Sequence, residues 1–146
     1  MTQTALHERL ATLYSAFRLG QLDFVLNAFD DEVEFISHSP TEIFPFLGHR
    51  RGKAAMAEVL KSTHEEFDLI SYEPMSMVVE AEEAAIVLFA RGINRKTRRS
   101  VQLSIAHFLT FKDGKIVELR EFMDSFSAAE QVLGRELDIG GDVHLL

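Results

Sequence analysis

Asp124 is the strongest candidate for acid–base chemistry in this sequence. It follows the last strand-like run and stands between two aromatic residues, Phe122 and Phe126. Apolar neighbours desolvate a carboxylate and favour its protonated form, which suits a general acid or base that works at neutral pH. The alternative is that Asp124 caps the N-terminus of a following helix, a common role for aspartate at such a junction. The two roles are compatible.

Arg91 and His38 are the other two candidate catalytic residues. Arg91 lies within a strand-like run, just after Phe89, where a guanidinium usually pairs with a carboxylate or reaches solvent at an edge. In a pocket it would polarise or orient a ligand, but pairing with Asp124 would favour the ionised carboxylate and argue against general-acid chemistry. His38 ends a short strand before an apolar loop, and it is either a pocket residue or solvent-exposed.

Three further aromatic residues are candidates for the wall of a ligand pocket. The segment 39–49 contains Pro40 and Pro45, which prevent regular structure, yet it includes Phe44 and Phe46. Such an apolar loop must cover either the core or a ligand. Tyr14 stands beside the apolar stripe of the first helix, where its alternative role is at the edge of the core with its hydroxyl in water.

Composition excludes several classes of function. The chain has 146 residues, 47% of them hydrophobic, a formal net charge of −8 and no cysteine. A negative surface repels nucleic acid and anionic lipid, and the absence of cysteine removes disulfides and thiolate metal sites. No histidine pair has helical i, i+4 spacing and no phosphate-binding loop is present, so neither a metal nor a cofactor is expected. We expect no membrane segment and a cytoplasmic location.

The order of predicted elements indicates an α+β fold in one domain spanning 1–146. Its core covers about 6–133, with a C-terminal tail over 138–146. Apolar spacing of three and four residues predicts helices first, and period-two runs predict hairpin-connected strands afterwards. The predicted helices cover 6–17, 22–29, 52–67 and 127–135, and the predicted strands cover 33–38, 72–80, 84–95, 100–112 and 115–124.

Several ordered segments resemble the nuclear transport factor 2-like superfamily, and within it the SnoaL-like and ketosteroid-isomerase-like proteins. No one segment is very specific, but their order along the chain is. The resemblance implies a cone-shaped fold in which a curved antiparallel sheet is wrapped by N-terminal helices around an internal apolar pocket. It also implies a frequent homodimer. The matching segments are 13–17 with Gly20, 22–23, 28–33, Gly48, 52–56, 107–108, 113–116 and 120–124.

The same resemblance disfavours two of the family's reactions. The ketosteroid isomerases carry an oxyanion-hole aspartate at the position of Ala106 and a proton-shuttling aspartate near Ile36. The family's epoxide hydrolases carry a catalytic aspartate at the position of Ile93, two residues after an arginine that matches Arg91. The resemblance also aligns Asp124 with an acidic residue that does acid–base work in the related cyclases. Because fold does not settle function in this family, an enzyme and a binding module both stay open.

The register of the last hairpin decides which face His107 occupies. A two-residue turn at 113–114 sets His107 opposite Arg120, on the face of Phe122 and Asp124, whereas a three-residue turn with a glycine bulge shifts the register by one and sends His107 to the other face. The resemblance favours the shift, with Ala106 and Phe108 in the pocket and His107 as a packing or dimer-face residue. The expected pocket residues are Tyr14, Phe44, Phe46, Phe89, Ala106, Phe108 and Phe122.

Three functional hypotheses follow. The first is an isomerase, cyclase or dehydratase that uses Asp124 on a small apolar ligand, with residues 43–47 as a lid. The second is a non-catalytic module that binds or senses an apolar metabolite. The third is a dimerising scaffold, because apolar residues are available to both faces of the sheet. A small apolar molecule and a second copy of the chain are the expected partners.

Overall fold

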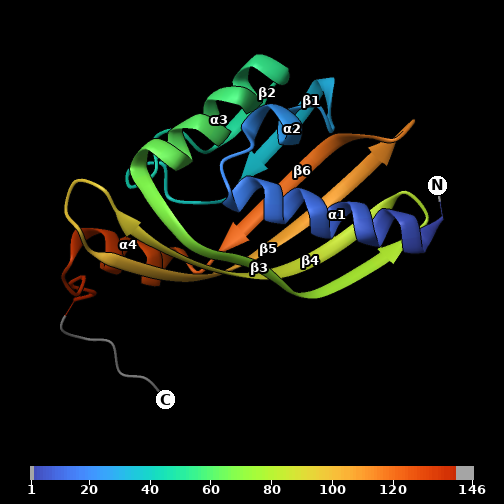
Figure 1. Cartoon of the computed structure of the whole chain (residues 1–146). Helices are drawn as coiled ribbons and strands as arrows, with labels where there is room; N and C mark the ends of the chain where they lie inside the picture. Colours follow the sequence, from blue (N-terminus) through green and yellow to red (C-terminus); the bar gives the residue numbers. More distant parts are fainter. Residues whose placement is uncertain (1, 141–146) are drawn as a thin grey trace.

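A computed structural model describes residues 2–140 and consists of four helices and six strands (Figure 1). Three helices precede most of the sheet, and the fourth follows it. The segment 141–146 of the predicted tail lies outside the described residues. The elements are α1 (Gln3–Arg18), α2 (Leu22–Leu26), β1 (Phe29–Ser37), β2 (His49–Arg51), α3 (Lys53–Glu66), β3 (Phe67–Glu80), β4 (Glu83–Asn94), β5 (Ser100–Lys112), β6 (Lys115–Met123) and α4 (Ser125–Leu133).

Helix α1 has well-defined signals at both ends. The hydroxyl of Thr2 accepts a hydrogen bond from the backbone N–H of Ala5 at 3.0 Å, so it caps the first turn. Gly20 follows the last turn with φ of +79°, the left-handed conformation that glycine adopts without strain. Between these signals one face of α1 is buried, and Leu10 and Tyr14 lie on it. The helix therefore presents an apolar face, with one phenol on it, to the sheet.

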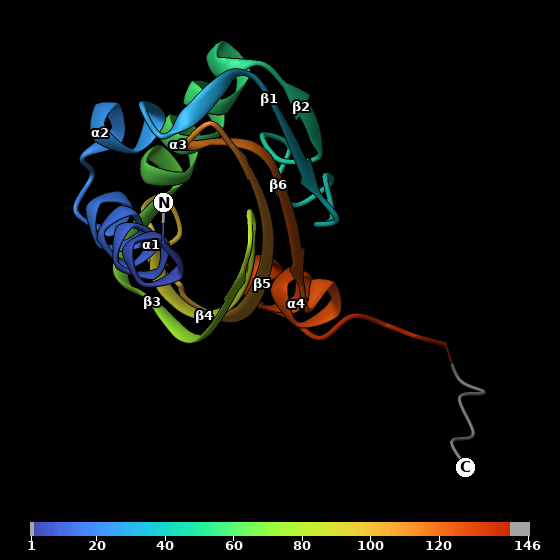
Figure 2. The ribbon, with the colours of Figure 1, turned by 90° about the vertical axis from the view of Figure 1, so that its right-hand side faces the viewer.

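The sheet has strand order β2-β1-β6-β5-β4-β3. Four of its neighbouring pairs are antiparallel, but β1 and β6 are parallel, so the sheet is mixed and not wholly antiparallel as predicted. Figure 2 shows the strands curving into an open ring, with α1, α2 and α3 closing the open side and α4 outside it. Among the described residues, no helix is long and apolar enough to cross a membrane.

Strand pairing overrides the helix prediction at two phenylalanines. Phe29 begins β1 opposite Ile116, and Phe67 begins β3 opposite Asn94, whereas the sequence assigned both to helices. Phe67 has φ of −127° and ψ of 139°, which are extended values. Its apolar side chain fits either structure, and the long ladder between β3 and β4 selects the strand. The short strand β2 was not predicted, because its three residues have no apolar pattern.

The hairpin between β5 and β6 contains a tight turn and a bulge. Lys112 pairs with Lys115 across a two-residue turn in which Asp113 and Gly114 both have positive φ. Beyond the turn the register shifts by one residue, because Val117 is left over between two successive pairs. His107 consequently pairs with Glu121. Both side chains lie on the concave face of the sheet.

Candidate functional site

An apolar cavity of about 150 Å³ lies between the helices and the concave face of the sheet. Its wall comes from the three N-terminal helices α1, α2 and α3, the segment 39–48 and the inward-facing residues of β1 and β3–β6. Most of the wall is aliphatic or aromatic, as in ligand sites that bind apolar molecules. The polar exceptions in the described wall are Tyr14, Thr63, Tyr72, His107 and Glu121.

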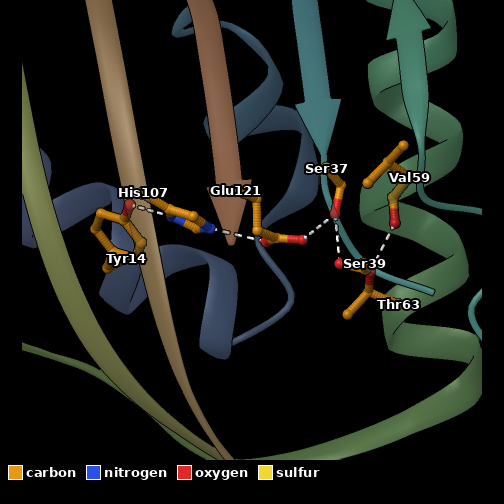
Figure 3. Close-up of polar contacts among 7 residues, drawn as sticks. All are labelled: Tyr14, Ser37, Ser39, Val59, Thr63, His107 and Glu121. Atoms are coloured by element: carbon orange, nitrogen blue, oxygen red, sulfur yellow. Dashed lines mark hydrogen bonds and ion pairs between the residues drawn. The ribbon is translucent and has the colours of Figure 1, made fainter. Parts of the chain in front are cut away.

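Three of these polar residues form a hydrogen-bonded relay (Figure 3). The hydroxyl oxygen of Tyr14 lies 2.5 Å from Nδ1 of His107, and Nε2 of His107 lies 2.8 Å from Oε2 of Glu121. All three residues are buried, with 7%, 4% and 7% of their surfaces exposed. They come from α1, β5 and β6, so the relay exists only when the first helix is docked on the last hairpin.

Glu121 is held ionised by its partners. Burial alone would raise its pKa, but the hydrogen bond and the electrostatic interaction with His107 and the hydroxyls of Ser37 and Ser39 together lower it below its usual value. Ser37 donates to Oε1 at 2.8 Å, and Ser39 lies 2.5 Å from the Ser37 oxygen. Both serines are buried, Ser37 as the last residue of β1 and Ser39 two residues beyond it. The ionised form of Glu121 is therefore stable in the wall of a largely apolar cavity.

The ionised carboxylate determines the direction of the hydrogen bonds. An ionised carboxylate can only accept hydrogen bonds, so the hydrogen between Nε2 of His107 and Oε2 of Glu121 is carried by Nε2. In the neutral ring Nδ1 is then the acceptor, and Tyr14 donates its hydroxyl hydrogen to it. Burial, and next the negative charge of Glu121, raise the pKa of Tyr14 well above its usual value, so this phenol keeps its proton at neutral pH.

Tyr72 is the second phenol of the cavity. It comes from β3, and its ring stacks on Tyr14 with the centroids 5.9 Å apart. Burial raises its pKa well above the usual value, and the charges of Glu121 and Tyr14 add to this effect. Its hydroxyl has no hydrogen-bond partner among residues 2–140, whereas the hydroxyl of Tyr14 is engaged by His107.

Asp124 lies outside the cavity. Its carboxylate accepts a hydrogen bond from the backbone N–H of Ser127 at 3.1 Å and caps α4, which is the alternative role that the sequence left open. The side chain is exposed, and it is not part of the cavity wall. The expected desolvation by Phe122 and Phe126 does not occur, because both rings are themselves on the surface.

Arg91 and His38 also lie on the outer surface. Arg91 is exposed, since its neighbour Ala90 is the residue of β4 that faces inward at this point. His38 is exposed and stacks on Phe122 with ring centroids 4.4 Å apart. It contacts Arg120 at 3.4 Å. Neither residue can reach a ligand inside the cavity from these positions.

The predicted pocket residues divide between the two faces of the sheet. Tyr14, Phe44 and Phe46 line the cavity. The prediction was wrong for the remaining four, because strand alternation places them on the convex face. That face exposes 37% of Phe89, 49% of Phe108 and 39% of Phe122. The four residues on the wrong face are Phe89, Ala106, Phe108 and Phe122.

The prediction for His107 was wrong for a related reason. The favoured register shift does occur, but it comes from the bulge at Val117 and not from a three-residue turn. It pairs His107 with Glu121, and both side chains line the cavity. Glu121 was not identified as a candidate. The signal was present in the alternation of Leu119, Glu121 and Met123, where an acid interrupts the apolar face of the strand. Tyr72 carried no comparable signal in the sequence.

The part of the chain that the structure describes contains no cluster of side chains suited to a metal ion. No group of three or more histidine, aspartate or glutamate side chains there is arranged to hold a metal ion. His107 and Glu121 already bond to each other. The arrangement that the cavity does offer is a proton-transfer chain of a phenol, an imidazole and a carboxylate.

Comparisons with known proteins identify the family to which this chain belongs. The family model of the SnoaL-like domain matches residues 10–119, so the chain belongs to the SnoaL-like family of the nuclear transport factor 2-like superfamily. A search of curated proteins gives no match.

Solved structures show the same cone-shaped α+β fold. A candidate isomerase from Rhodopseudomonas palustris is 29% identical, with a TM-score of 0.81 over 92% of this chain and 100% of that one. A nuclear transport factor 2-like protein from Burkholderia xenovorans is 25% identical, with a TM-score of 0.76 over 90% of this chain and 98% of the other. A protein from Catenulispora acidiphila with a ketosteroid isomerase-like fold, in complex with trimethylamine, is 11% identical. Its TM-score is 0.71 over 88% of this chain and 93% of that one, which shows the fold alone.

Proposed function

We propose that this protein catalyses proton transfer on a small apolar molecule that carries a carbonyl or hydroxyl group. The observation behind the proposal is the relay of Tyr14, His107 and Glu121 in the wall of an apolar cavity. Isomerisation, cyclisation and dehydration need only such transfers. The acid–base role assigned to Asp124 by the sequence passes to these three residues.

Each member of the relay has a distinct task. The oxygen of Tyr14 takes a proton from the ligand while its own proton moves to Nδ1 of His107. The imidazolium that forms is stabilised by the carboxylate of Glu121, 2.8 Å from Nε2. The reverse movement returns a proton to another atom of the ligand. This division follows the logic of a hydroxyl–histidine–carboxylate triad, in which the acid orients the imidazole and balances its charge.

Hydrogen exchange tests the proposal without knowledge of the natural substrate. Cyclic ketones of one to four rings are incubated with the protein in D₂O, and NMR follows deuterium incorporation beside the carbonyl group. The wild-type protein is expected to accelerate exchange for at least one ketone. Tyr14→Phe and Glu121→Gln are each expected to reduce the catalysed rate by a factor of about 10² to 10⁴, the usual range for acid–base catalysis.

Asp124→Asn is the matched control for this experiment. It removes an exposed carboxylate that lies outside the cavity, so the catalysed exchange should be unchanged. Loss of exchange in Asp124→Asn with retention in Tyr14→Phe would reverse the assignment. Absence of catalysed exchange with every ketone that binds would reject catalysis.

Non-catalytic binding is the second candidate function, and one observation favours it. Every buried side-chain nitrogen or oxygen atom in residues 2–140 has a hydrogen-bond partner or contacts accessible space, without any ligand. A relay whose hydrogen bonds are all formed without a ligand can serve only to stabilise the buried carboxylate, with no part in catalysis. This function predicts saturable binding of an apolar metabolite without turnover, and native mass spectrometry of the protein purified from its own host tests it.

The convex face of the sheet supports a homodimer. Val87, Phe89, Phe108 and Phe122 are all exposed there, and a cluster of exposed large apolar side chains is typical of an interaction surface. We propose that a second copy covers this face. Sedimentation at micromolar concentration is expected to give a dimer of the 16.5 kDa chain and a monomer for Phe108→Glu. A monomeric wild-type protein would contradict the proposal.

A further inference from the structure

The chain of hydrogen bonds continues beyond Glu121. Oε1, the carboxylate oxygen that His107 does not contact, accepts a hydrogen bond from Ser37 at 2.8 Å, and the Ser37 oxygen lies 2.5 Å from that of Ser39 (Figure 3). Glu121 belongs to the cavity wall, but neither serine does. The two hydroxyls therefore extend the relay from the cavity wall into the structure behind it.

The outer end of this chain of hydroxyls lies close to solvent. Ser37 is the last residue of β1, and Ser39 begins the segment 39–48. Ser39 keeps 8% of its surface exposed, and the nearby residues His38 and Thr41 are exposed. Four hydrogen bonds of 2.5 to 2.8 Å thus join a phenol in the cavity wall to a hydroxyl near the molecular surface.

The hydrogen bonds point toward Glu121 from both sides. Ser37 has one hydroxyl hydrogen and the ionised carboxylate can only accept, so that hydrogen lies between Ser37 and Oε1. The hydrogen between the two serines must then come from Ser39, whose hydroxyl donates to Ser37. On the other side, His107 donates to Oε2. Glu121 is therefore the acceptor at which an inner and an outer chain of donors meet.

We propose that Ser37 and Ser39 form a proton path between Glu121 and solvent. This inference rests on the proposed function only in taking Tyr14 and His107 as the route by which a proton leaves the cavity. A proton enters when a hydronium ion gives it to the Ser39 oxygen while the Ser39 hydrogen passes to Ser37 and the Ser37 hydrogen passes to Oε1. Each serine gains one proton and loses one, the hydronium ion becomes water, and Glu121 becomes a neutral carboxylic acid.

The same path returns a proton from the cavity to water. The imidazolium that forms when His107 accepts the Tyr14 proton gives its Nε2 hydrogen to Oε2 of Glu121. The carboxylic acid then turns about its Cγ–Cδ bond, a torsion with two equivalent orientations, and presents the hydrogen to Ser37. Once both hydroxyls have rotated, Ser37 takes this hydrogen and passes its own to Ser39, which releases one to water. The carboxylate is restored, and no water molecule has entered the cavity.

Exchange of the His107 Nε2 hydrogen with water measures the path without any ligand. This hydrogen is covered by Glu121, 2.8 Å away, and NMR of the isotopically labelled full chain follows saturation transfer to it from water. Ser39→Val and Ser39→Thr have side chains of the same shape, but only threonine retains the hydroxyl. Ser39→Val should slow the exchange by a factor of at least about 10², the lower end of the range for positioned proton transfer. Ser39→Thr should exchange at the wild-type rate.

Equal exchange rates in Ser39→Val and Ser39→Thr would overturn the path. Urea denaturation of both variants separates this effect from exchange through global unfolding. Ser39→Cys keeps the shape of serine but has only a weak donor, so it serves if Ser39→Val does not fold. It should also exchange more slowly than wild type, and an unchanged rate would overturn the path in the same way.

The outcomes distinguish this inference from the proposed function. Slow Nε2 exchange in Ser39→Val, combined with no deuterium incorporation into any ketone by the wild-type protein, would retain the path and reject catalysis. If the wild-type protein does exchange a ketone, Ser39→Val should slow the incorporation of deuterium and leave the affinity for that ketone unchanged. Weaker ketone binding in Ser39→Val with Nε2 exchange at the wild-type rate would overturn the path and assign Ser39 a structural role.

Discussion

Replacing His107 with leucine isolates Glu121 in the protein interior. The substitution introduces an apolar side chain in β5 and removes the donor 2.8 Å from the carboxylate. Ser37 remains as a partner, which is insufficient for a full charge in a buried site. Removing the partner of a buried charge typically destabilises a protein by about 3 to 5 kcal/mol. The isolated carboxylate can reduce that cost by taking up a proton.

Proton uptake sets the magnitude and its dependence on pH. A free glutamate has a pKa of about 4.3, so protonating it costs about 4 kcal/mol at pH 7 and about 1 kcal/mol at pH 5. The native variant then binds a proton that the unfolded chain has released, and its free energy of unfolding must fall as the pH rises. We expect His107→Leu to be about 3 kcal/mol less destabilised, relative to wild type, at pH 5 than at pH 7.

Urea denaturation at pH 5, 6 and 7 measures this difference. The midpoint and the slope m are determined for both proteins, and an unchanged slope shows that the two-state comparison is valid. The double variant His107→Leu/Glu121→Gln is the control, because it has no carboxylate to protonate and should lose the pH dependence. A destabilisation by His107→Leu that is equal at pH 5 and pH 7 would refute the reasoning.

Two further predictions concern the carboxylates. Asp124→Ala removes the cap of α4 and is expected to lower the free energy of unfolding by about 1 kcal/mol, measured by urea denaturation, with ketone exchange unaffected; slowed exchange would contradict its placement outside the cavity. In the wild-type protein the native pKa of Glu121 lies below its unfolded value, so its stabilising effect is complete above the unfolded pKa of about 4.3 and is lost as the pH falls through the native pKa. The stability advantage of wild type over Glu121→Gln should therefore shrink between pH 5 and pH 3, and an advantage that grows in acid would contradict it.

The elements of the fold were largely accessible from the sequence. The apolar stripe of α1, Gly20 after it and the positive φ of Gly114 in the last hairpin are local signals, and each is present as predicted. The parallel pairing of β1 with β6 was not accessible, because it joins segments more than 80 residues apart through the sheet. Phe29 and Phe67 were misassigned for the same reason, since non-local pairing decided their conformation.

The site was harder to predict because strand residues alternate between two faces. Phe108 and Phe122 are aromatic residues that would suit the wall of a pocket, but they lie on the convex face. Their neighbours His107 and Glu121 lie on the concave face. The bulge at Val117 adds one residue to β6 and so determines which set faces inward. No single residue in 107–123 predicts that bulge. Tyr14 and Phe44 were predictable because a helix stripe and a proline-rich apolar loop leave less freedom.

The two phenols of the cavity have a spectroscopic consequence. The chain contains two tyrosines and no tryptophan, and both tyrosines, Tyr14 and Tyr72, line the cavity. The tyrosine fluorescence of this protein thus originates wholly from the cavity wall, where Tyr14 is hydrogen-bonded to His107 and Tyr72 is not. A ligand that enters the cavity should change the tyrosine emission, so ligand binding can be measured by fluorescence with the unlabelled wild-type protein.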